Sequence, residues 1–133
     1  MSYEESLKSV TFEADATVGI YTGVAGQPGS ASPNSGKMYC FVKITGAHQV
    51  GLCTAATDLP VGILQNKPQK PGAAATVGIY GISNVIASAA IAAGALVAPT
   101  ATGTAVTDAT NGKYQAIKAA TVAGEMIPVI RVR

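Results

Sequence analysis

Short runs of β-branched and small apolar residues, separated by glycine and proline, make up most of this sequence. Its 133 residues include 15 glycines and 7 prolines, the residues that most often end strands and form turns. Many short strands with tight turns and almost no helix are typical of an all-β protein. We therefore expect a small β-sandwich or partly open β-barrel with long loops and at most one short helix.

Alternation of apolar and small or polar residues predicts the individual strands. The expected strands span residues 16–22, 37–45, 50–54, 61–65, 75–81, 95–98, 114–119 and 126–132. The second has the strongest pattern, with Met38, Cys40, Val42 and Ile44 on one face, and a turn at residues 46–49 follows it. The strands at 61–65 and 75–81 are expected to form a hairpin whose tip holds two prolines.

Two further segments carry local signals. Residues 83–94 have the features of a short helix, with Ser83 or Asn84 as N-cap, an alanine-rich interior and Gly94 as stop, although a non-helical connection fits equally well. Pro128 lacks a backbone N–H, so the final strand should lie at a sheet edge or contain a bulge.

The chain divides into an acidic beginning and a basic remainder. Residues 1–15 contain four acids and one lysine, whereas residues 16–133 contain eight basic residues and three acids. This predicts an extended acidic N-terminal arm over residues 1–15 and a single β domain over residues 16–133. The arm is either a solvated terminus or a segment that docks on the basic surface of a neighbouring copy. A long loop over residues 23–36, rich in Gly, Pro and Ser, is also expected to be functional or mobile.

Composition and charge argue against several classes of function. A net charge of +2 is far too small for a nucleic-acid-binding surface. The apolar stretch 82–98 is interrupted by polar residues, glycine and proline and is at the short limit for a membrane span, so we expect no membrane role. The acidic N-terminus does not resemble a secretory signal, which predicts synthesis in a cytoplasm.

Catalytic and metal-binding patterns are not evident. Cys40 and Cys53 lie thirteen positions apart beside a single histidine, so zinc-ligand spacing is lacking. We expect two buried, reduced thiols, with a disulfide as the alternative if their strands are neighbours. His48 sits in a turn, and the acids Asp58, Asp108 and Glu125 are scattered through turns. We predict a protein that is not an enzyme and holds no cofactor or metal.

Four motifs follow one another in the second part of the chain: residues 59–65 (LPVGILQ), 75–85 (ATVGIYGISNV), 89–97 (AAIAAGALV) and 119–129 (AATVAGEMIPV). In their order and spacing, residues 40–133 resemble the small bacteriophage capsid cement, or head decoration, proteins. The resemblance implies a non-enzymatic virion protein on the outer surface of an assembled phage head, made in the host bacterial cytoplasm. Its implied partner is the major capsid protein, whose adjacent capsomers it would clamp.

Three segments are the expected contacts with that partner, because arms, loops and stiff tips can reach across a subunit seam. They comprise the arm residues Tyr3, Glu4, Glu5 and Leu7, the loop residues Gln27, Pro28, Pro33 and Asn34, and the tip residues Asn66, Lys67, Pro68 and Lys70. A homo-oligomer is also expected, with a trimer favoured and a dimer as the alternative. Two other functions stay open: a carbohydrate- or receptor-binding β module on a virion surface, and a structural subunit of a tail or baseplate.

Overall fold

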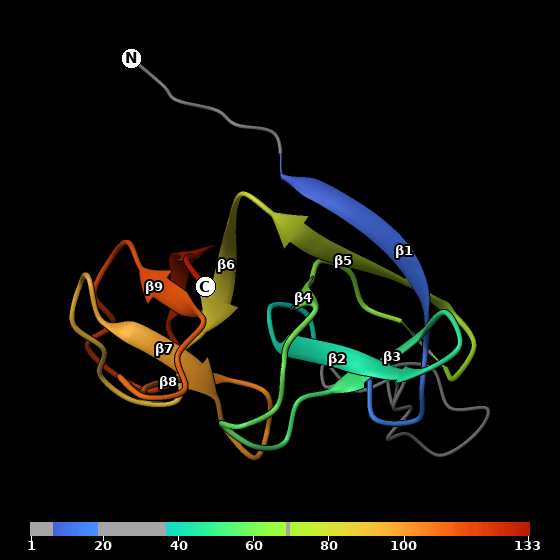
Figure 1. Ribbon diagram of the computed structural model, residues 1–133, viewed down its shortest axis with the longest axis horizontal. Helices are drawn as coiled ribbons and strands as arrows, with labels where there is room; N and C mark the ends of the chain where they lie inside the picture. The colour runs from blue at the N-terminus through green and yellow to red at the C-terminus, as the bar shows by residue number, and fades with distance from the viewer. Residues whose placement is uncertain (1–6, 19–36, 69) are drawn as a thin grey trace, which may run out of the picture.

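The computed structural model describes residues 7–18, 37–68 and 70–133, and folds them into ten strands in two sheets (Figure 1). These described residues contain no helix, which confirms the all-β class. The strands are β1 (Lys8–Ala14), β2 (Phe41–Gly46), β3 (Gln49–Leu52), β4 (Gly62–Leu64), β5 (Ala74–Tyr80), β6 (Ile82–Ile86), β7 (Leu96–Pro99), β8 (Ala105–Thr107), β9 (Tyr114–Ala116) and β10 (Met126–Arg131).

The first sheet is a closed barrel in the order β1-β3-β2-β4-β5. All of its pairings are antiparallel except that of β1 with β3, where Glu13 lies opposite Gln49 and Ala14 opposite Val50. The expected hairpin between residues 61–65 and 75–81 is confirmed as β4 and β5, and the expected turn between β2 and β3 is present. Closure leaves this sheet without a free edge.

The second sheet has the order β6-β10-β9-β7-β8 and lies beside the barrel (Figure 1). It curls strongly, because Ala87, just after β6, forms a parallel bridge with Ala105 at the start of β8. β5 passes into β6 through Gly81, whose φ of 104° is a conformation that glycine adopts without strain. The expected barrel or sandwich is therefore a barrel joined to a curled sheet.

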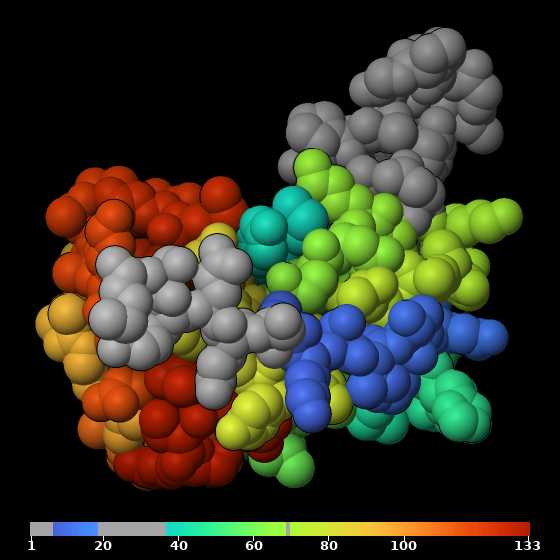
Figure 2. Space-filling view, turned by 90° about the horizontal axis from the view of Figure 1, so that it is seen from above, coloured from blue at the N-terminus to red at the C-terminus, as the bar shows by residue number. Residues whose placement is uncertain are grey.

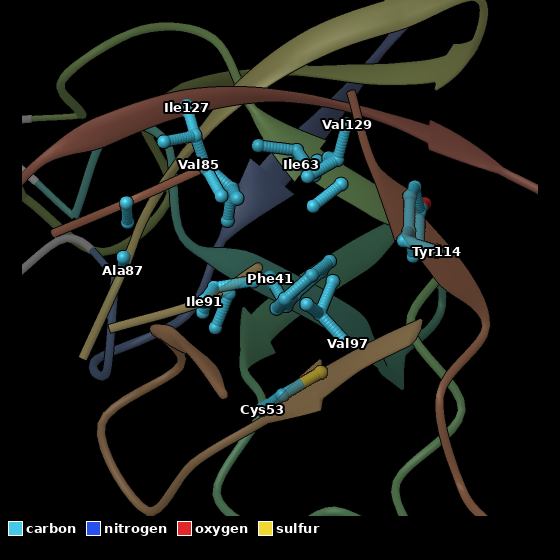
Figure 3. Packing of buried hydrophobic residues seen from close by; sticks show 13 residues of the cluster. Phe41, Cys53, Ile63, Val85, Ala87, Ile91, Val97, Tyr114, Ile127 and Val129 are labelled. Atoms are coloured by element: carbon cyan, nitrogen blue, oxygen red, sulfur yellow. The ribbon is translucent and has the colours of Figure 1, made fainter. Parts of the chain in front are cut away.

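Strands β2 and β4 form a wall shared by two separate cores. Their alternation directs Val42 and Leu64 into the barrel and Phe41 and Ile63 into the second sheet. Figure 3 shows Phe41 and Ile63 among side chains of the second sheet, including Val97 and Val129. The two sheets are thus held together by buried apolar surface, which is the dominant stabilising contribution in folded proteins.

The helical alternative for residues 83–94 is wrong. Residues 82–86 form β6, with Ser83 and Val85 buried and Ile82 and Asn84 exposed, and they pair in register with β10. The local helix signals are outweighed by burial of alternate side chains and by a complete pairing partner. Gly94 does take a positive φ of 85°, but it does so in the turn that precedes β7.

Pro128 lies in an interior strand of the second sheet and pairs with Asn84 of β6 without a shift of register, so the expectation of an edge strand or a bulge is also wrong. β10 pairs with β6 on one side and with β9 on the other, but β9 is paired only opposite residues 129–131. The carbonyl of Pro128 accepts a hydrogen bond from the N–H of Ile117, on the β9 side. The backbone nitrogen of Pro128 points to this same side of β10, beyond the last residue of β9. The missing N–H of proline therefore removes no hydrogen bond from the pairing of β9 with β10.

The first described residues belong to the barrel. Residues 8–14, part of the expected arm, form β1. This strand pairs with β5 along the whole length of β5, and its pairing with β3 on the other side closes the barrel. Residues 16–18, expected to begin a strand, form a turn held by Asp15, whose Oδ1 accepts the N–H of Thr17. The remainder of that expected strand and the loop at 23–36 lie outside the described residues, which resume at Lys37.

Candidate interaction surface

The proline tip between β4 and β5 is built around Asn66. The Asn66 side chain donates from Nδ2 to the carbonyl of Ala74 (2.8 Å) and accepts from the N–H of Thr76 at Oδ1 (2.9 Å). Pro68 is buried, whereas Lys67 and Lys70 are exposed. Asn66 and Pro68 therefore shape the tip, and the two lysines supply the surface that a partner would meet.

Leu7 is half-buried and packs over the backbone of the barrel rather than projecting from it. A Cβ placed on Gly78 would lie 2.8 Å from Cδ2 of Leu7, so the absence of a side chain at position 78 makes room for the leucine. Leu7 thus packs the start of β1 against Gly78 of β5. Seven other predicted contact residues lie outside the described residues: Tyr3, Glu4, Glu5, Gln27, Pro28, Pro33 and Asn34.

Two hollows meet at Arg131, and sequence reasoning missed both. One, of about 440 Å³, is lined by Lys43, Ile44, Leu59, Pro60, Val61 and Arg131. The other, of about 300 Å³, is lined by Ile79, Tyr80, Gly81, Ile130, Arg131, Val132 and Arg133. Both hollows are open to solvent and carry exposed apolar side chains beside their cations, since Leu59 and Tyr80 are each 66% exposed. Large exposed apolar groups gathered at one place are typical of contact surfaces.

Arg131 connects the two hollows and is fixed in place. Its Nη1 donates to the carbonyl of Pro60 (3.0 Å), its Nε donates to the carbonyl of Arg133 (3.1 Å), and its guanidinium lies 5.8 Å from the centre of the Tyr114 ring. The only sequence signal for this role was a single cation between Ile130 and Val132 in an otherwise apolar strand.

A partly buried ion pair borders the larger hollow. Lys43 Nζ lies 2.9 Å from Asp58 Oδ2, and the same oxygen accepts the backbone N–H groups of Thr54 (2.8 Å) and Ala55 (3.1 Å). The N–H of Thr54 makes the largest contribution to lowering the pKa of Asp58 below its usual value, and Lys43 and the N–H of Ala55 lower it further. Asp58 therefore orders the turn from Thr54 to Asp58, and Lys43 is held at the rim.

The other residues considered as candidates for chemistry, His48, Asp108 and Glu125, lie in or beside turns. His48 is exposed in the β2–β3 turn with a φ of 52°, and Asp108 and Glu125 accept hydrogen bonds from residues of their own turns. Those bonds lower the pKa of each carboxyl, chiefly through the N–H of Asn111 for Asp108 and the hydroxyl of Thr121 for Glu125. Within residues 7–18, 37–68 and 70–133, no three His, Cys, Asp or Glu residues gather as metal ligands would.

Both cysteines are buried and free, as expected for reduced thiols. They belong to different cores, Cys40 to the barrel and Cys53 to the second sheet. Burial raises the pKa of Cys53 to about 12, with a smaller contribution from nearby Asp58, and burial raises that of Cys40 as well. The part of the chain that the structure describes has no helix with the length and apolar character to span a membrane.

Comparison with known proteins shows the fold but no family. No protein-family model matches the sequence, and neither does any curated protein. Among solved structures, the chain is similar to the N base of the head fiber protein gp8.5 of bacteriophage phi29, with a TM-score of 0.62 and 19% sequence identity. The match covers 94% of this chain and 95% of the other, so the two proteins share their fold over nearly their whole length.

Proposed function

We propose that this chain is a non-enzymatic structural protein of a bacteriophage virion that binds the outer surface of the head. The observation that carries the proposal is the shared fold with a phage head fiber base across 94% of the chain. The resemblance of residues 59–65 and 119–129 to head decoration proteins supports the same conclusion from the sequence. The protein is then made in the host cytoplasm and joins the virion as a cement or decoration subunit.

The described surface suits attachment rather than catalysis. A barrel and a curled sheet that share a wall form a rigid body, and apolar side chains such as Leu59 and Tyr80 stand exposed on it. An interface with apolar groups at its centre and charged groups at its rim is common between proteins. Lys67 and Lys70 at the proline tip are exposed on the same body.

The proposed partner is the major capsid protein, bound by a homo-oligomer for which a trimer is favoured. A capsid lattice presents the same site many times, so symmetric copies with modest individual affinity bind strongly together. Each copy would hold adjacent capsomers and oppose their separation under internal pressure.

Co-sedimentation with expanded, undecorated capsids of the phage that encodes the protein tests this proposal. Saturable binding, followed by cryo-EM density at fixed lattice positions on the outer surface, is the expected result. Density on tails would instead assign the chain to a tail or baseplate. Failure to bind capsids together with binding on a glycan array would identify a carbohydrate- or receptor-binding module.

Variants of the tip locate the contact. Lys67→Glu with Lys70→Glu should reduce capsid occupancy at least tenfold if the tip meets the capsid, while Lys118→Glu, an exposed lysine elsewhere, serves as the matched control. Removal of residues 2–6 tests the arm without damage to β1, which begins at Lys8. Unchanged occupancy in either variant removes that segment from the interface.

A further inference from the structure

The smaller hollow, at the junction of β5, β6 and the end of β10, has the character of a binding site for an extended segment. Its volume is about 300 Å³, and it is lined by apolar and aromatic groups, including Tyr80 and Val132. Tyr80 is 66% exposed and Val132 is 46% exposed, and Ile82 beside them is 47% exposed. Such side chains gain most from a partner that removes them from water.

The charges at this hollow are positive. Arg131 and Arg133 line it, and Lys8 lies opposite Tyr80 in the β1–β5 ladder. Arg131 uses Nε and Nη1 for the carbonyls of Arg133 and Pro60, which fixes its guanidinium at the wall. A complementary ligand therefore has apolar or aromatic side chains together with carboxylates.

The acids of the described chain are engaged elsewhere. Asp15, Asp58, Asp108 and Glu125 each accept hydrogen bonds within or beside their own turns. Glu13 lines a third hollow together with Phe12 and His48, near the β2–β3 turn. The acids left in the sequence are Glu4 and Glu5, which follow Tyr3.

The first described residues, Leu7 and Lys8, lie at the rim of this hollow. Leu7 packs over Gly78, and Lys8 pairs with Tyr80, which is a lining residue. In the space-filling view, β1 (blue) lies against β5 and β6 (yellow), and the strands of the second sheet (orange to red) lie beyond them (Figure 2). Residues 1–6 span at most about 20 Å when extended, which is enough to cover a hollow of this size.

We propose that this hollow binds residues 1–6 of the same chain, with Tyr3 against the apolar wall and Glu4 and Glu5 beside Arg131 and Arg133. A segment joined to the rim by one or two residues has an effective concentration in the millimolar range or above. The same segment of a second copy competes poorly against it at ordinary protein concentrations. Docking of residues 1–6 in this hollow requires no capsid.

Disulfide trapping tests the proposal on the full chain. Ser2→Cys is combined with Val132→Cys at the hollow or, as a control, with Ala47→Cys in the exposed β2–β3 turn near the far end of β1. The native thiols interfere little, because both are buried and have raised pKa values. The expected result is a disulfide within one molecule that forms at least tenfold faster for the Val132 pair than for the Ala47 pair.

A charge exchange separates specific docking from random collision. Glu4→Arg with Glu5→Arg should slow trapping of the Val132 pair several-fold, and addition of Arg133→Glu should restore part of the rate. One molar salt should also slow the unaltered pair. Equal rates for the two cysteine pairs overturn the proposal, and so does cross-linking into dimers at micromolar protein, which would assign the segment to a second copy.

Discussion

Arg131 and Pro60 lie 71 residues apart in the sequence, yet the guanidinium Nη1 of the first donates to the carbonyl of the second over 3.0 Å. The bond joins β10, the last strand in the chain, to Pro60, two residues before β4 of the barrel. It reinforces the contact that Phe41 and Ile63 make through the shared wall. The larger hollow lies directly around this bond.

Replacement of Arg131 should destabilise the whole protein. Arg131→Ala removes two charge-assisted hydrogen bonds and leaves the partly buried carbonyl of Pro60 without this donor, so we expect a loss of about 2 kcal/mol in unfolding free energy. Urea denaturation followed by circular dichroism measures it. Arg133→Ala, at an exposed neighbour, should change stability by less than about 0.5 kcal/mol. Equal effects of the two substitutions would show that the bond to Pro60 contributes little.

The two thiols should react only when the protein unfolds. Cys40 and Cys53 are buried and the pKa of each is raised by that burial, so both accessibility and thiolate concentration are low at neutral pH. Labelling with a thiol reagent should be slow in native conditions and should modify both residues together at the rate of global opening. The exposed Ala47→Cys variant provides the fast control. Rapid labelling of one native thiol alone would reveal local opening of its core.

Alkaline pH should weaken the fold through Cys53. Its pKa rises to about 12 in the folded state from an ordinary value of 9.0, so its favourable contribution is complete below pH 9 and is lost between about pH 9 and 12. Cys53→Ala should lower stability at pH 7 but flatten its decline over that range. Urea titrations at several pH values check this, and parallel curves for the two proteins would contradict it.

Asp58 should show the opposite pH dependence. Its carboxyl has a lowered pKa because Thr54, Lys43 and Ala55 donate to it, so its contribution is present above about pH 4 and disappears as the pH falls below that. Asp58→Ala should cost about 1 kcal/mol at pH 7, with the difference from the unaltered protein shrinking towards pH 2. Glu13→Ala, at an exposed position of β1, is the control and should have little effect.

Gly62 should tolerate no side chain. A Cβ at this position would meet the backbone carbonyl of Gly78 in the neighbouring strand β5, so Gly62→Ala should force the two strands apart and cost several kcal/mol. Gly94→Ala is the comparison, because its φ of 85° is unfavourable for alanine but nothing lies within 4 Å of the added atom. Its cost should be about 1 kcal/mol. Thermal unfolding of both variants measures the difference.

Local patterns predicted much of the secondary structure. The hairpin of β4 and β5 and the turn at residues 46–49 follow from short-range alternation and turn residues. These features depend on neighbours within a few positions, which the sequence displays directly. The strand expected over residues 37–45 begins only at Phe41, and Ile44, expected on the same buried face as Val42, is 52% exposed. The proline tip was located correctly as a connection, although the role of Asn66 as a bridge to Ala74 and Thr76 was not visible.

Errors arose where a distant partner determined the outcome. The helical signals at residues 83–94 were overruled by pairing of β6 with β10, and Pro128 occupies an interior strand because β9 ends opposite it. Residues 8–14 become a strand because the barrel closes on them. In each case the deciding contact comes from a segment tens of residues away.

By itself, then, the sequence determined an all-β chain of short strands and the positions of several turns, because the alternation of side chains and the special conformations of glycine and proline are local properties. Only the tertiary structure decided that Phe41 and Val42, adjacent in one strand, enter two different cores. It also decided that Arg131 lies between two apolar hollows. Strand order and sheet closure depend on the summed burial and hydrogen bonding of remote segments, and no short stretch of sequence contains that sum.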